Sequence, residues 1–434
     1  MITVRDGNIQ INKGKAVIGY DLTKTTAQIS YYFVSDPEPQ TVSVITGAEQ
    51  YNIPTVLSKR PGVGQWLYGQ DAIKSAEEGY ILVDDLLLKA LRGEEVMVED
   101  CLYDPVSLLT LFIKRTLGLL NMGVGMKNTE AFMFTVEELD TRVVEVLSRI
   151  AATLNLQDVK ISYESHKESF YNYVLHQSPE LWARGVLSFE YNEGLTSMLL
   201  ESTKNTKPSV VTIRSAEYSG MSRITWPEDE DEKENKREEL DLQFADIARN
   251  VVEKNDIGTV YLLGDGFKEG WAKESLRVVC RNRRVFQGNN LYSKGACYSM
   301  RELLNPSELD RAYVYLGDDK LKSNIGMKAI RRGEDSYFAI LDAGKAWYKA
   351  KADFDMILED GDEFSLILTS VTGGHITEKV IKLDGLPKRP RGTTRLSFHV
   401  EMSSINTLEI EITDLGFGEI IKSSGRAWNH SIEI

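Results

Sequence analysis

Two stretches of this chain, about 170 residues apart, share one pattern of strand, acidic residue, polar turn and returning strand. The first begins with the apolar run Ala16–Ile18, reaches Asp21, turns, and continues as an alternating strand to Val34. The second occupies Gly185–Leu200 and carries its acid at Glu190. A long unit that recurs in this way predicts a duplicated domain, with one strand hairpin opening each half.

The tip of the first hairpin, Thr23–Thr26, offers backbone N–H groups, hydroxyls and the ammonium group of Lys24. Groups of this kind can surround a phosphate. An ordinary edge hairpin with a polar tip is the alternative that this stretch alone leaves open. The second hairpin favours the phosphate loop, because a lone edge hairpin gives no reason for a repeat.

Composition excludes several kinds of partner. The chain has 434 residues, enough for about two to four domains. Its net charge of −14 argues against a nucleic-acid-binding face and against an anionic membrane surface. No apolar run is long enough to span a bilayer, and the first residues lack a secretory signal pattern. Three scattered cysteines and five histidines show no metal-ligand spacing, so we expect a cytoplasmic protein without a zinc site.

The pattern of the chain changes after residue 305. Before that point, helical and strand patterns alternate, with helices expected at Leu240–Glu253 and Glu269–Cys280. The charged run Pro227–Glu239 is expected to be a solvated loop and helix start. Period-two strands with Gly, Asp and Pro turns then fill Ala312–Ile434, and Glu419–Lys422 is one of the strands expected there. The sequence therefore predicts a separate all-β domain at this end.

Motifs in this all-β region resemble the peptide-binding β-sandwich of the 70-kilodalton heat-shock (DnaK-like) chaperones. The residues that carry the resemblance are Leu383–Pro387, Arg389–Gly392 and the turn at Ser403–Leu408. Asn324–Met327 resembles the first strand of the same domain. The resemblance implies partners that are proteins or extended peptides. The sequence ends directly after the last expected strand, so we expect no helical lid over a bound peptide.

The preceding residues are similar, in the order of their motifs, to the ATPase domain of the same family. The resemblance implies an α/β actin-like (ribonuclease-H-like, duplicated) ATPase fold with a reduced second-lobe subdomain, followed by an all-β sandwich. The expected domains are 1–311, with lobes of about 1–180 and 181–311, a linker at 312–319, and the sandwich at 320–434.

The resemblance also implies a site for ATP or ADP with Mg²⁺. Its acids would be Asp21, Glu164 and Glu190, with Asp21 and Glu190 at the metal, and Glu164 in a connecting helix motif. The residues implied at the nucleotide are Thr23, Lys24, Thr25, Asn192, Gly194, Gly264, Asp265 and Gly266.

Several substitutions weaken this site. Thr23 and Lys24 stand where the family has glycine and threonine, and Asn192 and Glu193 replace two glycines of the second loop. A carboxylate at Glu193 would repel phosphate, most strongly in a desolvated cleft. Lys24 is either a phosphate ligand or a surface lysine. Asp265 either binds a ribose hydroxyl or caps the next helix, and the cap is favoured.

These departures leave two main hypotheses. The first is a divergent chaperone-like protein that binds ATP weakly, hydrolyses little or none, and couples the nucleotide to the β-domain. The second is a pseudo-ATPase interaction scaffold that binds no nucleotide. A small-molecule kinase of the same superfamily is disfavoured, because such kinases lack the β-domain.

Overall fold

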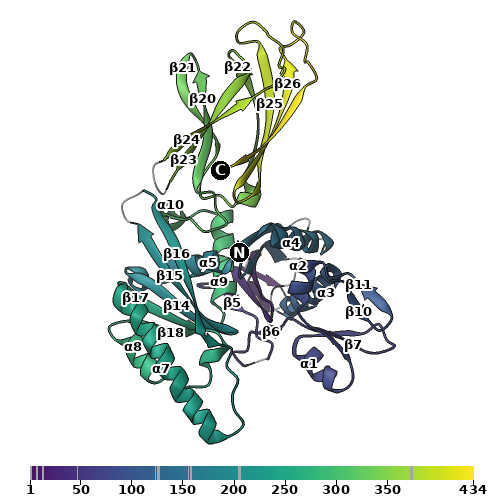
Figure 1. Ribbon diagram of the computed structural model, residues 1–434. Helices are drawn as coiled ribbons and strands as arrows, with labels where there is room; N and C mark the ends of the chain where they lie inside the picture. Colours follow the sequence, from purple (N-terminus) through teal and green to yellow (C-terminus); the bar gives the residue numbers. More distant parts are fainter. Residues whose placement is uncertain are drawn as a thin grey trace. The chain divides into compact units, whose positions relative to one another are not determined.

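The computed structural model divides into two compact units, residues 1–314 and 315–434, each described by itself below (Figure 1). The structure describes residues 2–5, 8–11, 14–45, 47–122, 124, 128–154, 156, 159–203, 207–371 and 375–434. No helix in these ranges is long and apolar enough to cross a membrane.

The first half of the first unit is built on a mixed sheet in the order β13-β12-β3-β4-β5, with β6 paired to β4. β3 pairs antiparallel with β4 and parallel with β12, and β12 is parallel to β13. The strands are β3 (Ala16–Leu22), β4 (Thr26–Phe33), β5 (Gln40–Thr41), β6 (Ile53–Pro54), β12 (Thr129–Val136) and β13 (Lys160–Ser165).

The second half repeats this arrangement in a sheet of order β18-β17-β14-β15-β16-β19. β14 pairs antiparallel with β15 and parallel with β17, as β3 does with β4 and β12. The strands are β14 (Gly185–Tyr191), β15 (Gly194–Thr203), β16 (Ser209–Ser222), β17 (Ile257–Leu263), β18 (Arg284–Gly288) and β19 (Tyr313–Tyr315). Two copies of one mixed sheet, each opening with a hairpin, define the duplicated actin-like fold expected from the repeat.

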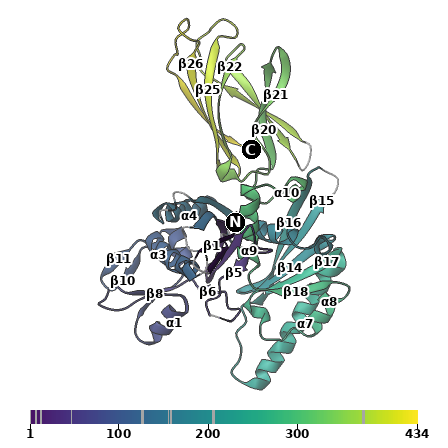
Figure 2. The same cartoon turned by 180° about the vertical axis from the view of Figure 1, so that it is seen from behind.

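Helices pack on both sheets, and local signals set their ends. Asp104 and Asp140 accept backbone N–H groups at the starts of α3 (Pro105–Leu117) and α4 (Thr141–Thr153). In the second half, α7 (Glu230–Lys254) packs along one face of the sheet (Figures 1 and 2). The charged run is thus largely helix, which begins at Glu230 because Asp229 caps it.

Helix α9 (Leu291–Leu304) packs on β3 and on α5 (His166–Leu175). Glycine is required at both crossings: a Cβ on Gly19 would lie 2.1 Å from the Ser293 carbonyl oxygen, and one on Gly295 would lie 2.0 Å from that of Ser169. These two glycines bring α9 close to the first hairpin. The helix therefore carries its side chains into the region between the two hairpins.

One sequence expectation for the second half needs correction, and another agrees with the structure. Helix α8 begins at Glu274 rather than at Glu269, because Asp241 accepts the N–H groups of Lys273, Glu274 and Ser275. Only residues 223–229 connect β16 to α7, which leaves no room for an inserted subdomain there and agrees with the reduced second lobe.

Smaller elements complete the unit. They are β1 (Ile2–Arg5), β2 (Asn8–Ile11), β7 (Leu57–Lys59), β8 (Trp66–Tyr68), α1 (Gly69–Glu77), β9 (Ile81–Val83), α2 (Leu86–Arg92), β10 (Val96–Val98), β11 (Cys101–Tyr103), α6 (Pro179–Trp182), α8 (Glu274–Cys280) and α10 (Glu308–Ala312), with short 3₁₀ turns at Gly118–Met122 and Asp265–Phe267.

The second unit is an all-β sandwich of two antiparallel sheets, ordered β21-β20-β23-β24 and β22-β25-β26-β27. Aromatic rings join the sheets: Phe364 contacts Phe398 with ring centroids 5.3 Å apart, and Phe338 contacts Phe354 at 5.0 Å. The strands are β20 (Ser323–Arg331), β21 (Glu334–Leu341), β22 (Lys351–Leu358), β23 (Glu363–Ser370), β24 (Ile376–Lys382), β25 (Thr394–Ser404), β26 (Thr407–Gly416) and β27 (Ala427–Glu433), with a 3₁₀ turn at Trp347–Lys349.

The strand expected at Glu419–Lys422 is wrong. This segment belongs to the turn between β26 and β27, where an isolated bridge joins Phe417 to Ile421. Gly416 and Gly418 both have positive φ, at 68° and 62°, which reverses the chain before a strand can form.

Candidate functional site

The acid of the first hairpin is buried and already has a cationic partner. Asp21 lies at the end of β3 with 5% of its surface exposed. His166, the first residue of α5, places its Nε2 2.7 Å from Asp21 Oδ1 and is itself buried. Burial lowers the pKa of His166, but the charge and hydrogen bond of Asp21 outweigh it, and the net pKa is raised. The contact with Asp21 therefore favours the protonated, cationic form of His166.

The acid of the second hairpin is bound by a tyrosine from α9. Tyr292 Oη donates a hydrogen bond of 2.5 Å to Glu190 Oε2, and Asn192 Nδ2 donates one of 2.9 Å to Glu190 Oε1. Burial raises the pKa of Glu190, and burial together with Glu190 raises that of Tyr292 well above its usual value. Both oxygens of the carboxylate are thus occupied by protein donors.

These two pairs are joined into one chain of side chains. The ring of Tyr292 stacks on that of His166 with centroids 3.9 Å apart and an angle of 7° between the planes. Asp21, His166, Tyr292 and Glu190, in that order, therefore connect the first hairpin with the second, and we call them the cleft cluster. His166 and Tyr292 were not among the residues expected at the site, because neither lies in a motif of its own.

The third expected acid, Glu164, lies beside Asp21 on the first sheet. Register pairs Asp21 with Thr135 and Thr135 with Glu164, so the three residues lie side by side on neighbouring strands. Glu164 is fully buried and accepts a 2.5 Å hydrogen bond from Ser169 Oγ. It lies in strand β13, one residue before the strand ends, and not in a helix, which corrects the expected helix motif.

The polar tip of the first hairpin is used mainly to close its own turn. Thr23 Oγ1 accepts the N–H groups of Thr26 at 2.9 Å and Thr25 at 3.3 Å. Lys24 is about half exposed, and its Nζ lies 3.6 Å from Glu137 Oε2. Of the two alternatives for Lys24, this position favours a surface lysine.

The glycine turn after β17 packs against the second hairpin. Gly264 has a φ of +91°, and a Cβ there would lie 2.5 Å from the Tyr191 carbonyl oxygen. A Cβ on Gly266 would lie 2.7 Å from the Tyr191 ring, and Asp265 N–H donates to Asn192 Oδ1 at 3.1 Å. The space beside these glycines is filled by Tyr191 and Asn192.

Asp265 does not have the capping role that the sequence favoured. Its carboxylate is exposed, lies 2.7 Å from Lys268 Nζ and accepts a long 3.5 Å hydrogen bond from Asn52. The cap of α8 is Asp241 instead. The structure thus leaves Asp265 at the surface of the turn, next to the second hairpin.

The acidic substitution in the second loop is also exposed. Glu193 Oε1 lies 3.4 Å from Arg223 Nη1, and both side chains are more than half exposed. Glu193 is therefore solvated and not desolvated, so water and Arg223 weaken the repulsion that it would exert on a phosphate. Gly194 begins β15 directly after it.

The motif arginine of the β-sandwich has a structural partner. Arg389 donates to both oxygens of Asp414, at 2.7 and 2.6 Å, and both side chains are buried. This bidentate pair fixes the segment before β25 onto the end of β26.

The residues of the cleft cluster do not fit a magnesium nucleotide. Asp21 and Glu190, the two acids expected at the metal, are each satisfied by neighbouring side chains. Within the described residues, no three His, Cys, Asp or Glu side chains come together to hold a metal ion. We therefore derive no step through a nucleotide or a metal.

The fold and this cluster define an actin-like protein with an internally paired cleft. Residues 38–318 match the model of a family described as "Family of unknown function (DUF5716) C-terminal", and the chain belongs to this family. Residues 320–434 match a "Domain of unknown function (DUF8552)". A search of the curated proteins found no match.

Solved structures that resemble the chain do so distantly. A MamK non-polymerising mutant bound to AMPPNP is 10% identical with a TM-score of 0.36, over 66% of this chain and 98% of its own. A glucokinase from an Antarctic psychrotroph is 7% identical with a TM-score of 0.36, over 66% and 99%. A reductive activator for a corrinoid, iron-sulfur protein is 11% identical with a TM-score of 0.34, over 73% and 67%.

Proposed function

We propose that this protein is a pseudo-ATPase scaffold: an actin-like unit that binds no nucleotide, joined to a β-sandwich that binds polypeptide partners. The observation that carries the proposal is the buried pair of Asp21 and His166, with 2.7 Å between Oδ1 and Nε2. A hydrated Mg²⁺ at Asp21 would have to displace an imidazolium that is already desolvated and in contact. That exchange gains little, because one cation replaces another.

The second hairpin supports the same proposal. Glycines let a backbone approach a phosphate closely, but here Gly264 and Gly266 let Tyr191 approach instead. Glu190 is held by Tyr292 and Asn192, so a ligand would have to break two hydrogen bonds to reach it. Weak nucleotide binding, the first hypothesis from the sequence, would require this cluster to open.

Calorimetry on the full chain tests the proposal. Wild-type protein titrated with ATP and Mg²⁺ up to millimolar concentration should show no saturable heat. Glu193→Gly should stay equally silent, because Glu193 is exposed and its charge is not the obstacle.

Asp21→Ala is the control that shows whether any binding of ATP depends on Asp21. Magnesium-dependent binding by the wild type with a Kd below 1 mM, lost in Asp21→Ala, would overturn the scaffold proposal and restore weak nucleotide binding. Binding that appears in Glu193→Gly would show instead that charge repulsion is the cause.

The polypeptide-binding part of the proposal rests on the resemblance of the β-sandwich to a peptide-binding domain. Among the described strands, β24 lies at the edge of its sheet and pairs only with β23, so its other side can form hydrogen bonds with an added chain. The outer face of the same sheet offers a more specific site, described next.

A further inference from the structure

One outer face of the β-sandwich exposes several large apolar side chains among its charged ones. Side chains alternate along each strand, so the outer face of a two-sheet sandwich should be polar. The outer face of β21-β20-β23-β24 instead exposes Ile330 (55%), Tyr337 (48%), Ile376 (69%) and Val380 (54%). On β20, outward-facing Ile330 follows the alternation set by the buried side chains of Ile325 and Met327. The exposed residues therefore belong to regular strands and not to an irregular loop.

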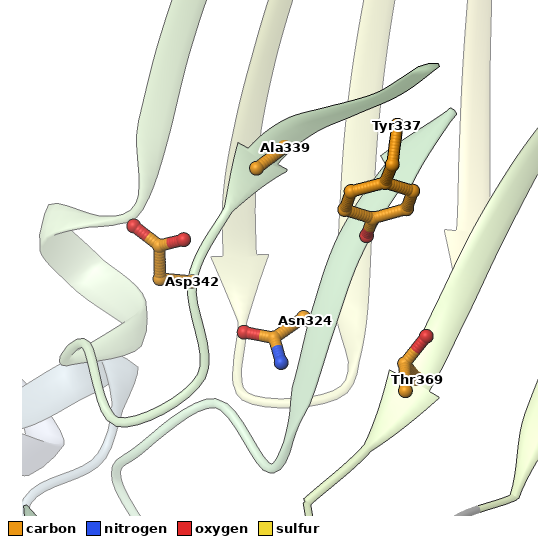
Figure 3. Close-up of a pocket in the computed structure, with 5 residues that line it drawn as sticks. All are labelled: Asn324, Tyr337, Ala339, Asp342 and Thr369. Carbon is orange, nitrogen blue, oxygen red and sulfur yellow. The ribbon is translucent and has the colours of Figure 1, made fainter. Parts of the chain in front are cut away.

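This face is hollowed at the lower ends of its strands. A pocket of about 360 Å³ lies against β20, β21 and β23 (Figure 3). Its lining residues are Asn324, Tyr337, Ala339, Asp342 and Thr369. The volume lies at the small end of the range for ligand sites and suits one long side chain better than a drug-sized molecule.

The floor of the pocket is an aromatic ring laid on a glycine. A Cβ on Gly326 would lie 2.4 Å from atoms of the Tyr337 ring, so the ring can rest on the sheet only because residue 326 has no side chain. Gly326 on β20 lies opposite Ala339 on β21, so the side chain next to the glycine is also small. About half of Tyr337 remains exposed, which makes it a platform on which a planar or cationic group can stack.

One of the polar residues that line the pocket is a carboxylate. Asp342 is the charged residue of the lining, and its pair with Lys345, at 3.1 Å, involves two side chains that are more than half exposed. Burial, and then the charge of Asp342, raise the pKa of Tyr337. Asn324 Oδ1 accepts the Ala343 N–H at 2.9 Å and so is fixed in place.

We propose that this pocket binds the arginine or lysine side chain of a polypeptide segment that lies across the apolar outer face of β21-β20-β23-β24. The cation would stack on Tyr337 and face Asp342, while neighbouring apolar side chains of the segment would contact residues such as Val380. An anionic side chain is disfavoured by Asp342, and the exposed isoleucines favour a polypeptide over a free sugar. This inference rests on the polypeptide-binding part of the proposed function.

Anisotropy with labelled peptides on the full chain tests the inference. The probes are fluorescein-labelled heptapeptides of alternating valine and threonine with arginine, citrulline or glutamate at the centre. Citrulline keeps the shape of arginine and removes its charge. The arginine peptide should bind about tenfold more tightly than the citrulline peptide, as expected for a partly desolvated cation on an aromatic ring beside a carboxylate.

Substitutions then assign the contact to the pocket. Tyr337→Ala should weaken the arginine peptide about tenfold, Tyr337→Phe should leave it nearly unchanged, and Asp342→Asn should weaken it severalfold. Asp353→Asn, an exposed acid on β22 of the other sheet, is the matched control and should have no effect.

Three outcomes would overturn the inference: equal binding of the arginine and citrulline peptides, no loss in Tyr337→Ala, or displacement of the peptide by a linear oligosaccharide. If none of the three peptides binds while calorimetry with ATP stays silent, the pocket assignment fails and the nucleotide-free cleft stands.

Discussion

Replacing His166 with alanine removes the cation from the cleft cluster and leaves Asp21 buried without a partner. The exposed fractions of the two side chains are 8% and 7%, so the aspartate cannot turn to water without opening the structure. Breaking a buried ion pair on one side costs about 3–5 kcal/mol. The lost stack on Tyr292 adds about 1 kcal/mol. We expect His166→Ala to lower the free energy of unfolding by about 4–6 kcal/mol in total.

The assay is urea unfolding of the full chain at pH 6, followed by tryptophan fluorescence, with slopes compared between variants. His399→Ala is the matched control, because His399 pairs with Asp353 at 2.6 Å but their side chains are 41% and 75% exposed. An exposed pair of this kind contributes at most about 1 kcal/mol. The two histidines thus share nearly the same contact distance and differ in burial.

A double variant separates the charge from the packing. Asp21→Asn combined with His166→Ala removes the unpaired carboxylate, so it should be more stable than His166→Ala alone. A loss in His166→Ala no larger than that in His399→Ala would refute the reasoning. So would a double variant whose loss equals the sum of the two single losses.

Three further predictions concern pH, the β-sandwich and the glycine turn. The pKa of His166 is raised in the folded state, so the stability that its ion pair contributes is complete below the unfolded pKa of about 6.5 and is lost as pH rises through the folded pKa. The difference in the free energy of unfolding between wild type and His166→Asn, measured in urea, should therefore shrink above the folded pKa. The stability that Asp414 contributes has the opposite pH dependence: Arg389 holds the pKa of Asp414 far below normal, so the contribution is present above a pH of about 4 and is lost in acid. Asp414→Asn should destabilise the sandwich by about 3–5 kcal/mol in thermal unfolding at pH 7. In strong acid, the variant and the wild type should be equally stable. Gly264→Ala combines a positive φ with a close contact to Tyr191 and should cost about 2 kcal/mol or more by urea unfolding; a neutral result would show that the turn can move away from the second hairpin.

Local patterns in the chain predicted much of the fold. The helix expected at Leu240–Glu253, with its start in the charged run before it, follows from helical spacing, which acts within a few residues. The two hairpins follow from period-two alternation and short polar turns, and their recurrence predicted the duplicated sheets. The errors at Glu269 and Glu419 arose where a distant side chain or a pair of positive-φ glycines decided the outcome.

The candidate site was only partly predictable for a related reason. The hairpin pattern marked Asp21 and Glu190, and the family resemblance marked the turn at Gly264; the structure links the two acids through His166 and Tyr292. The partners that occupy them lie far along the chain: His166 is 145 residues from Asp21, and Tyr292 is 102 residues from Glu190. No periodicity links residues at such separations.

The sequence by itself determined that the chain forms two related α/β halves and a β-sandwich, because strand alternation, helix caps and turn residues act over a few residues. Only the tertiary structure decided what the cleft acids do. Packing of α9 on Gly19 and Gly295 brings Tyr292 between the hairpins, and the start of α5 brings His166 to Asp21. A buried carboxylate is open to a ligand only if no side chain of the protein already binds it, and the packing of the helices determines which side chains do.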